Sequence, residues 1–329
     1  MPLNILIVGA GIGGFASAVA LRKAGHHVTV LEKHKDKREV GFAVSLPPNS
    51  TRVLRSLGLD FKRARASKFG GIAFAKVDTP DYEMIGQMPD DAEDVYGAPS
   101  LAAHRVDLHN ALRDMAEGPG DGTPAVVREG INVVSYNPGA GSVTLEDGST
   151  LTADAIIAAD GVRSTAHKHI LGYERPATLS KMSNVRFCLP TDTMLNNPQL
   201  KRTLLNGDYP TIYRTSNPNA MLFRYPCRDH TLQNFGCYAI TDPSTASTQW
   251  QHQTNLDILL SRLEGFDAPF REIAHLADPD DMYLWKVRDR DPLPSYHKGR
   301  MILLEDAGVL GVVLRDVHRP EEVEARLKG

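Results

Sequence analysis

The pattern of apolar and polar residues predicts an α/β unit at the start of the chain. Residues 5–8 are a short apolar run, typical of a buried strand, and an alanine-rich helical segment follows as far as Ala24. A second apolar strand covers residues 28–31 and ends at Glu32. Residues 47–58 begin with prolines and end with a glycine, which predicts a helix.

Elements of both kinds continue through the first half of the chain. A short strand is predicted at residues 72–77, and residues 104–117 carry apolar side chains at near-helical spacing. Residues 131–151 alternate as in a small β-meander with an Asp-Gly turn, and residues 155–159 are another buried-strand run. We therefore expect residues 1–175 to form one α/β domain.

The pattern then changes to short strands rich in aromatic residues. Such strands are predicted at residues 185–189, 212–215, 221–225 and 235–240, followed by a helix at 256–263. Aromatic residues and proline-containing loops gather here, as expected for an antiparallel sheet that covers a ligand. We expect this second domain to span residues 176–290.

The last segment, residues 291–329, mixes a strand with helices. A strand is predicted at residues 301–304, and helices are predicted at 306–315 and 321–328. The predicted fold class is therefore α/β, with a Rossmann-like domain and an interleaved antiparallel-sheet domain.

A complete dinucleotide-binding fingerprint lies between the first two strands. Gly9 permits the tight turn from strand to helix, and Gly11 lets the backbone approach a pyrophosphate without a Cβ in the way. Gly14 allows close packing of the helix on the strand, and the helix N-terminus offers N–H groups to the anion. Glu32 ends the second strand, where a carboxylate can accept hydrogen bonds from a ribose.

Composition and charge exclude several classes of function. The chain has 329 residues, 42% of them hydrophobic, and a net charge of −3, which gives no electrostatic basis for binding nucleic acid. Cys188, Cys227 and Cys237 are scattered without a CxxC pair, which argues against a disulfide framework or a metal site. No apolar stretch approaches the length of a membrane span. We expect a cytoplasmic protein without a membrane segment, and the oligomeric state stays open.

Several segments together resemble the FAD-dependent aromatic hydroxylases, which are single-component flavoprotein monooxygenases of the salicylate hydroxylase type. The fungal branch is the most similar. The segments are GAGIGG with Glu32, GFAVSLPPNSTRVLRSLGL, GAPSLAAHRVDLHNAL, ADAIIAADGVRS, YPCR and WKVRDRDPLPSYHKGRMILL. Their order and spacing match from residue 4 to about residue 304. The first domain would then bind FAD and the second would bind substrate.

The resemblance implies roles for individual residues. Glu32 would bind the adenosine ribose of FAD, while Ala43 and Arg105 would hold the cofactor further along. Asp160 and Gly161 match a DG motif that contacts FAD and the nicotinamide donor.

The resemblance also implies two catalytic residues on the second domain. Arg186 matches an arginine near the substrate and the flavin, and Tyr225 lies on a strand that lines the substrate pocket. Both are also ordinary strand residues in many proteins, so a purely structural role stays open for each.

The implied chemistry is hydroxylation of a small aromatic or phenolic substrate with O2. FAD would carry the difficult step, and NADPH or NADH would supply electrons. An arginine can pair with a substrate carboxylate or phenolate, and a tyrosine can hydrogen-bond a ring hydroxyl. The sequence identifies neither the substrate nor the choice between NADH and NADPH.

The chain departs from the family pattern after residue 304. Relatives carry a second FAD motif there, a Gly-Asp pair followed by a Gly-Gln-Gly turn, whereas this chain continues directly with Glu305 and Asp306. In one alignment Asp306 is the flavin-binding aspartate. In the other, which matches more residues, the whole motif is missing and residues 291–329 keep only a remnant of it.

Three functions are therefore compatible with the sequence. The leading one is an FAD- and NAD(P)H-dependent monooxygenase. The second is a truncated flavin-binding homologue with weak or no activity, which the missing motif favours. The third is an NAD-dependent dehydrogenase, which the DGVRS and YPCR segments disfavour.

Overall fold

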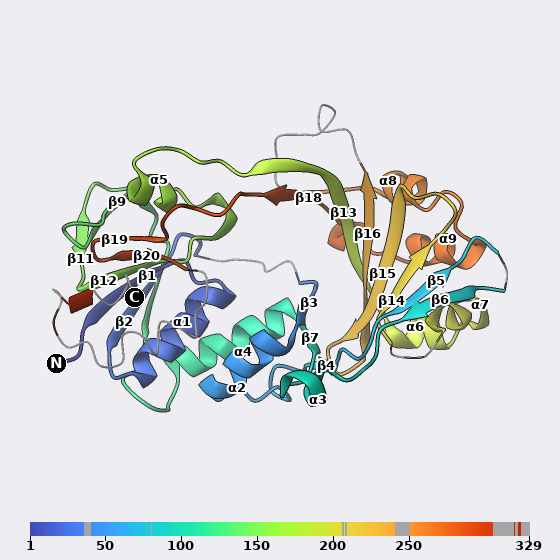
Figure 1. Cartoon of the computed structure of the whole chain (residues 1–329), viewed down its shortest axis with the longest axis horizontal. Coiled ribbons are helices and arrows are strands. Elements are labelled where there is room, and N and C mark those ends of the chain that lie inside the picture. The colour runs from blue at the N-terminus through green and yellow to red at the C-terminus, as the bar shows by residue number, and fades with distance from the viewer. Residues whose placement is uncertain are drawn as a thin grey trace.

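Two large β-sheets and the helices packed on them form two lobes (Figure 1). The structure is a computed structural model that describes residues 1–35, 41–79, 81–205, 207, 209–240, 251–304, 319 and 322–323. The predicted fold class is confirmed, because one lobe is a parallel sheet with helices and the other is built on a mainly antiparallel sheet.

The first lobe contains a six-stranded sheet. Its strands, in spatial order, are β19 (His297–Lys298), β20 (Met301–Leu303), β12 (Ala155–Ala158), β1 (Asn4–Val8), β2 (His27–Glu32) and β8 (Val126–Glu129). All neighbours are parallel except β19 and β20. Helices α1 (Ile12–Lys23) and α4 (Arg105–Glu117) contact each other closely beside this sheet.

Burial on both faces explains the unbroken apolar run of β1. Ile5 and Ile7 belong to the core shared with α1 and α4. Leu6 and Val8 belong to a second core, shared with a meander of β9 (Val133–Asn137), β10 (Ser142–Leu145) and β11 (Thr150–Thr152). A parallel strand covered on both sides needs apolar residues at every position, so the run does not alternate.

The second lobe contains an eight-stranded sheet. Its order is β17 (Gln251–Gln253), β18 (Tyr283–Asp289), β13 (Thr178–Pro190), β16 (Leu232–Ile240), β15 (Ala220–Cys227), β14 (Thr211–Arg214), β5 (Ala73–Lys76) and β6 (Glu83–Gln87). The pairs are antiparallel except β14 with β5. Strands β5 and β6 come from the first part of the chain, so the two lobes are interleaved.

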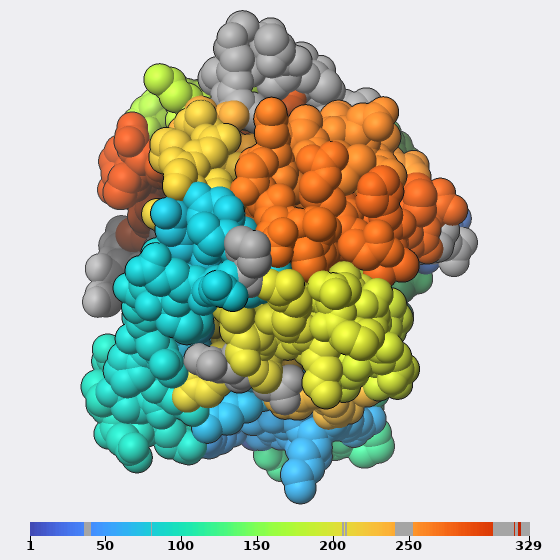
Figure 2. Space-filling view, turned by 90° about the vertical axis from the view of Figure 1, so that its right-hand side faces the viewer, coloured from blue at the N-terminus to red at the C-terminus, as the bar shows by residue number. Residues whose placement is uncertain are grey.

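Short helices cover the outer face of the eight-stranded sheet. They are α6 (Thr191–Leu195), α7 (Pro198–Lys201), α8 (Leu256–Arg262) and α9 (Ala268–His275). Their apolar side chains, among them Phe270 of α9, form one core with alternate residues of the strands, among them Phe187 and Phe235. Figure 2 views the molecule from this side and shows residues 251–290 in orange and 191–205 in yellow-green over the sheet. The inner face of the sheet is turned toward the first lobe (Figure 1).

A three-stranded sheet joins the lobes. Strand β7 (Leu101–His104) pairs with β3 (Ala43–Leu46) on one side and with β4 (Ser67–Lys68) on the other. The remaining α-helices of the described residues are α2 (Pro48–Leu57), α3 (Ala92–Tyr96) and α5 (Ala166–Leu171). Strand β3 is antiparallel to β7, which leads directly into α4.

Most elements predicted from the sequence are confirmed within about two residues at their ends, but β13 begins at Thr178 and β16 at Leu232, well before the strands predicted from residues 185 and 235. The helix predicted from residue 104 begins at Arg105, because His104 is the last residue of β7. Several short elements were not predicted, since their apolar patterns are too short or too mixed to stand out; they are β3, β4, β6, β7, β8, β17, β18, β19, α3, α5, α6, α7 and α9. The helix predicted at 306–315, together with Asp306, lies outside the described residues, as do all but two of residues 321–328.

No helix in the described ranges combines the length and the apolarity that crossing a membrane would require.

A buried arginine fastens α1 to the end of α4. The Arg22 side chain is only 1% exposed. Its Nη1 donates hydrogen bonds to the carbonyls of Met115, Ala116 and Gly118 at 2.7–2.9 Å, and Nη2 donates to that of Gly122 at 3.0 Å. The guanidinium thereby satisfies carbonyls at the C-terminal end of α4 that have no partner within the helix.

We predict that Arg22→Met lowers the free energy of unfolding by about 3 kcal/mol, because buried carbonyls lose charge-assisted hydrogen bonds. Urea unfolding followed by circular dichroism measures the change. The neighbouring Lys23→Met is the control, since Lys23 is exposed and should cost less than about 1 kcal/mol. Equal losses for the two variants would contradict the role given to Arg22.

Candidate functional site

The glycines of the fingerprint form a tight turn between β1 and α1. Gly9 has φ +108°, and a Cβ on it would lie 2.3 Å from the carbonyl oxygen of Ala159. A Cβ on Gly14 would lie 2.0 Å from the carbonyl oxygen of Gly9. Both positions therefore need glycine for the packing of the protein itself, whatever the turn binds.

Gly11 differs, because a Cβ there would meet no described atom within 4 Å. Its φ of −76° suits any residue, and it is the residue just before the first turn of α1. Open space in front of helix N–H groups fits the pyrophosphate of a dinucleotide. The fold itself therefore does not require glycine here, and the role of Gly11 in the approach of a pyrophosphate stays a prediction.

Glu32 lies beside the same turn. Its Oε2 accepts a hydrogen bond from the Ala10 N–H at 3.0 Å, and its Oε1 accepts one from the His34 N–H at 3.0 Å. These contacts hold the carboxylate at the end of β2. The carboxylate therefore lies where the fingerprint predicts that it binds a ribose diol.

Asp160 and Gly161 follow β12 at the neighbouring position along the sheet. The Tyr136 hydroxyl donates to Asp160 Oδ2 at 3.0 Å, and burial together with the Asp160 carboxylate raises the pKa of Tyr136. Asp160 Oδ1 is buried and accepts no hydrogen bond from the described residues. A buried carboxylate oxygen of this kind suits a ligand hydroxyl or N–H group. Together with the open Gly11 turn and Glu32, it fits the extended dinucleotide FAD.

The backbone of residues 41–43, called the strap below, leads into β3 between the two lobes. The carbonyl of Ala43 accepts hydrogen bonds from the Arg186 guanidinium at 2.5 Å and from the Tyr225 hydroxyl at 3.0 Å. The Ala43 N–H donates to Asn234 Oδ1 at 3.2 Å. Arg186 also donates to Asn234 Oδ1, at 3.1 Å. Three residues singled out from the sequence, Ala43, Arg186 and Tyr225, are therefore in direct contact.

These contacts define what Arg186 and Tyr225 do in the structure. Tyr225 is buried, and burial raises the pKa of its hydroxyl, which stays protonated and donates to Ala43. Arg186 uses Nη2 for both of its hydrogen bonds, so Nε and Nη1 make none with the described residues. Those two nitrogens remain available to an anionic ligand.

Aromatic rings line the same side of the sheet. The Arg186 guanidinium lies over the Phe42 ring, 5.0 Å from its centroid. Phe42 makes edge contacts with Tyr283 and Trp285 of β18, with ring centroids 6.0 and 6.4 Å apart. The inner face of the sheet thus presents apolar rings beside a cation, a surface suited to an aromatic anion.

Asn234 and Asn184 are residues of this site that sequence reasoning missed. Asn234 is 1% exposed, and its Oδ1 accepts hydrogen bonds from the Ala43 N–H of the strap and from Arg186. Asn184 lies two residues before Arg186 on β13, is 6% exposed, and its Oδ1 makes no hydrogen bond with a described residue. Asparagine within a strand carries no sequence signal of its own. Only the neighbouring strands of the folded sheet show what these amides contact.

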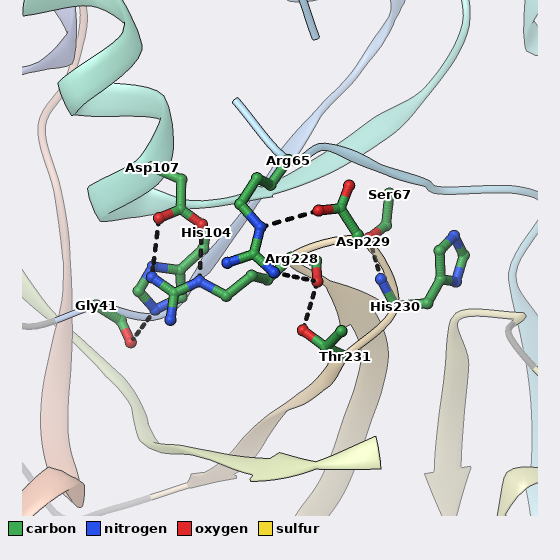
Figure 3. Close-up of polar contacts among 9 residues, drawn as sticks. All are labelled: Gly41, Arg65, Ser67, His104, Asp107, Arg228, Asp229, His230 and Thr231. Carbon is green, nitrogen blue, oxygen red and sulfur yellow. Dashed lines mark hydrogen bonds and ion pairs between the residues drawn. The ribbon is translucent and has the colours of Figure 1, made fainter. Parts of the chain in front are cut away.

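A polar network connects the strap to the tip of the β15–β16 hairpin (Figure 3). Arg228 forms a bidentate ion pair with Asp107 of α4, with Nε to Oδ2 at 2.7 Å and Nη2 to Oδ1 at 2.8 Å. Nη2 also lies 3.3 Å from Nδ1 of His104, and Nε2 of His104 lies 3.0 Å from the Gly41 carbonyl oxygen. Arg228, at the end of the YPCR segment, therefore contacts the first lobe.

A second ion pair holds the same hairpin. Arg65 Nε donates to Asp229 Oδ2 at 2.9 Å, and both side chains are exposed (Figure 3). Arg228, Asp229 and His230 all have positive φ, between 53° and 62°, a conformation that is strained for residues other than glycine. Contacts to the first lobe therefore maintain a turn that the local sequence disfavours.

The remaining predicted site residues are placed as follows. Arg105 begins α4, and its N–H donates to the Phe42 carbonyl at 2.9 Å, so it lies beside the strap. Asp306 lies outside the described residues. The roles given to all the predicted site residues stay predictions, although the structure brings Ala43, Arg105, Arg186 and Tyr225 together.

The family model and the curated relatives agree on one family of proteins. A family model described as FAD binding domain matches residues 3–308. An FAD-dependent monooxygenase of Aspergillus candidus is 32% identical, with 99% of this chain and 80% of the relative covered. The hispidin-3-hydroxylase of Neonothopanus nambi is 30% identical over 93% of this chain and 74% of the relative.

Solved structures share the fold. A salicylate hydroxylase in complex with its substrate has a TM-score of 0.75 at 22% identity, covering 99% of this chain and 83% of that one. The protein CtdE, solved with FAD and a substrate, has a TM-score of 0.83 at 18% identity, covering 99% and 84%.

The glycines of the turn provide a prediction that separates folding from binding. Gly11→Ala should leave the unfolding midpoint unchanged and weaken FAD binding by about tenfold or more, because its Cβ would occupy the open space where the pyrophosphate is predicted to bind. Gly14→Ala should destabilise the protein, because its Cβ would overlap the Gly9 carbonyl. Thermal unfolding without FAD and equilibrium titration with FAD measure the two effects. Unchanged FAD affinity in a stable Gly11→Ala variant would refute the placement of the pyrophosphate.

Proposed function

The chain belongs to the family of FAD-dependent monooxygenases, and we propose that it uses NAD(P)H and O2 to hydroxylate a small aromatic or phenolic molecule. One observation carries this proposal. The strap beside the dinucleotide-binding lobe and the aromatic inner face of the large sheet are joined at Ala43, by hydrogen bonds from Arg186 and Tyr225. A cofactor held by the first lobe would therefore adjoin a substrate held by the second.

The first lobe supplies the residues that would hold FAD. The Gly9–Gly14 turn and the N-terminus of α1 would receive the pyrophosphate, Glu32 the adenosine ribose, and Asp160 Oδ1 a further hydroxyl or N–H group. The chemistry that FAD supplies when bound is electron transfer from NAD(P)H and activation of O2 for insertion of one oxygen atom.

The second lobe supplies the residues that would hold the substrate. Phe42, Tyr283 and Trp285 offer rings against which an aromatic substrate can pack. Nε and Nη1 of Arg186 would bind a carboxylate or phenolate, and the amide oxygen of Asn184 would accept a hydrogen bond from a hydroxyl. Tyr225 would act by holding Ala43 in place. Named relatives include a hispidin hydroxylase and a hydroxybenzoate hydroxylase, which supports a phenolic substrate.

A second candidate is a flavin-binding homologue with little or no activity. The alignment with the Aspergillus candidus relative extends over 351 positions, more than the 329 residues of this chain, so that relative has residues with no counterpart here. The third interpretation, an NAD-dependent dehydrogenase, has no support from the family match, which is to an FAD-binding domain.

The test uses the purified full chain loaded with FAD. We expect flavin absorbance at one equivalent per chain, and oxidation of NADH or NADPH that speeds up when a hydroxybenzoate is added. Incorporation of isotopically labelled oxygen from O2 into the product, followed by mass spectrometry, establishes hydroxylation. Bound flavin with no stimulated oxidation across a panel of phenols and aromatic carboxylates would favour the second candidate instead.

We predict that Arg186→Met weakens binding of 3-hydroxybenzoate to the FAD-loaded protein by about 10- to 100-fold, the loss expected for a charge-assisted hydrogen bond. Titration calorimetry measures the dissociation constant. Arg214→Met is the matched control, because Arg214 is an exposed arginine of β14 whose Nη2 contacts the sulfur of Met221. Similar affinities for the Arg186 and Arg214 variants would contradict a role for Arg186 in binding the anion.

A further inference from the structure

The strap is held at every carbonyl. The Gly41 carbonyl pairs with the His104 ring, the Phe42 carbonyl accepts from the Arg105 N–H at 2.9 Å, and the Ala43 carbonyl accepts from Arg186 and Tyr225. The contacts to Ala43 come from the second lobe, and those to Gly41 and Phe42 come from the β7–α4 junction. The strap is thus held by the β7–α4 junction as well as by the sheet.

The network determines which nitrogen of His104 carries the proton. A guanidinium can only donate hydrogen bonds, so Nδ1 of His104 must be the acceptor of the contact with Arg228 at 3.3 Å. Nε2 then carries the hydrogen and donates to the Gly41 carbonyl at 3.0 Å. Asp107 holds the other side of Arg228 in a bidentate pair, which fixes the direction in which Nη2 points.

The strap packs closely against the His104 ring. A Cβ on Gly41 would lie 2.1 Å from Cε1 and 2.6 Å from Nε2 of His104. His104 itself is 7% exposed, and it pairs with Ala43 in the register of β3 and β7. A shift of the imidazole would therefore move Gly41, Phe42 and Ala43 together, and with them the surface under Arg186.

We propose that His104, oriented by the Asp107–Arg228 ion pair, is a positioning residue that holds the strap in the geometry required for cofactor and substrate binding. This inference rests on the proposed function, because FAD serves as the reporter of strap geometry. The network couples the two lobes, since Arg228 is on the β15–β16 hairpin and both His104 and Asp107 belong to the β7–α4 segment. The hairpin tip, whose backbone is strained, thereby contacts the histidine that holds the strap.

The two ion pairs of the hairpin provide a matched comparison. The Arg65–Asp229 pair fastens the turn to the first lobe and does not contact His104. The Arg228–Asp107 pair fastens the same turn, and its arginine also contacts His104 (Figure 3). A merely structural role predicts similar effects for the two pairs. A positioning role predicts that only the second pair affects ligand binding.

The experiment compares FAD dissociation constants and unfolding midpoints for Arg228→Met, Asp107→Asn, His104→Phe and His104→Gln, with Arg65→Met and Asp229→Asn as controls. We expect the first three to weaken FAD binding by about tenfold, the effect of one lost charge-assisted or buried hydrogen bond. The controls should lower the midpoint without changing FAD affinity. His104→Gln should retain most of the affinity, because its amide can accept from Arg228 and donate to Gly41.

The pH dependence of FAD binding is the second measurement. Burial and the charge of Arg228 lower the pKa of His104 below its ordinary value of 6.5, and Arg65 adds to this, while Asp107 opposes it. Although burial raises the pKa of Asp107, Arg228 lowers it overall, so Asp107 stays ionised at mildly acidic pH. Protonated His104 cannot accept from Arg228. Affinity should therefore fall as the pH drops below 6.5 in the wild type and less steeply in His104→Gln.

Equal FAD affinities for wild type, His104→Phe and Arg228→Met would overturn the inference and leave the proposed function intact. Equal losses in the two sets of ion-pair variants would also overturn it, in favour of a structural clamp. A wild-type chain that binds no FAD would overturn both proposals. Normal FAD binding with no hydroxylation would count against the proposed function alone.

Discussion

The position of the strap, residues 41–43, is the constraint on which the site depends. Its carbonyls accept hydrogen bonds from a histidine, a backbone amide, an arginine and a tyrosine, which come from both lobes. Phe42 and Ala43 are buried, and the Phe42 ring packs against Tyr283 and Trp285, so apolar packing and hydrogen bonding act on the same backbone segment. Hydrogen bonds at successive carbonyls align one lobe with the other.

Buried arginines recur in this protein with carbonyls as their partners. Arg22 donates to the end of α4, and Arg224 donates to the carbonyls of Gly207 and Tyr209, to Gln233 and to the Tyr213 hydroxyl. A guanidinium has five donors in a rigid fork, so several neutral acceptors can satisfy it where one carboxylate cannot. Arg22 thereby stabilises the end of a helix, and Arg224 fastens the loop before β14 to the sheet. Arg186 and Arg228 instead connect the lobes.

The glycines also fall into two groups, those that the fold requires and one that is proposed to be required by the ligand. Gly9, Gly14 and Gly41 are required by atoms of the protein, since a Cβ on any of them would overlap a described neighbour. Gly11 is required by none of them. One sequence motif therefore contains two kinds of glycine: Gly9 and Gly14 are required by the packing of the fold, and Gly11 is the one proposed to be required by the cofactor. The distinction decides which substitutions test binding and which test only folding.

The sequence by itself determined the α/β fold class, the dinucleotide turn and the family, because each depends on local pattern. Uninterrupted apolar strands, glycines at set spacing and an acid at the end of the second strand follow from neighbours along the chain. The tertiary structure alone decided that Arg186 and Tyr225 meet at Ala43, that Asn234 joins them, and that Arg228 orients His104. Those contacts join residues more than 40, and up to 191, positions apart. No local pattern carries them, because the pairing of β13, β16 and β15 and the docking of their hairpin on α4 bring the side chains together.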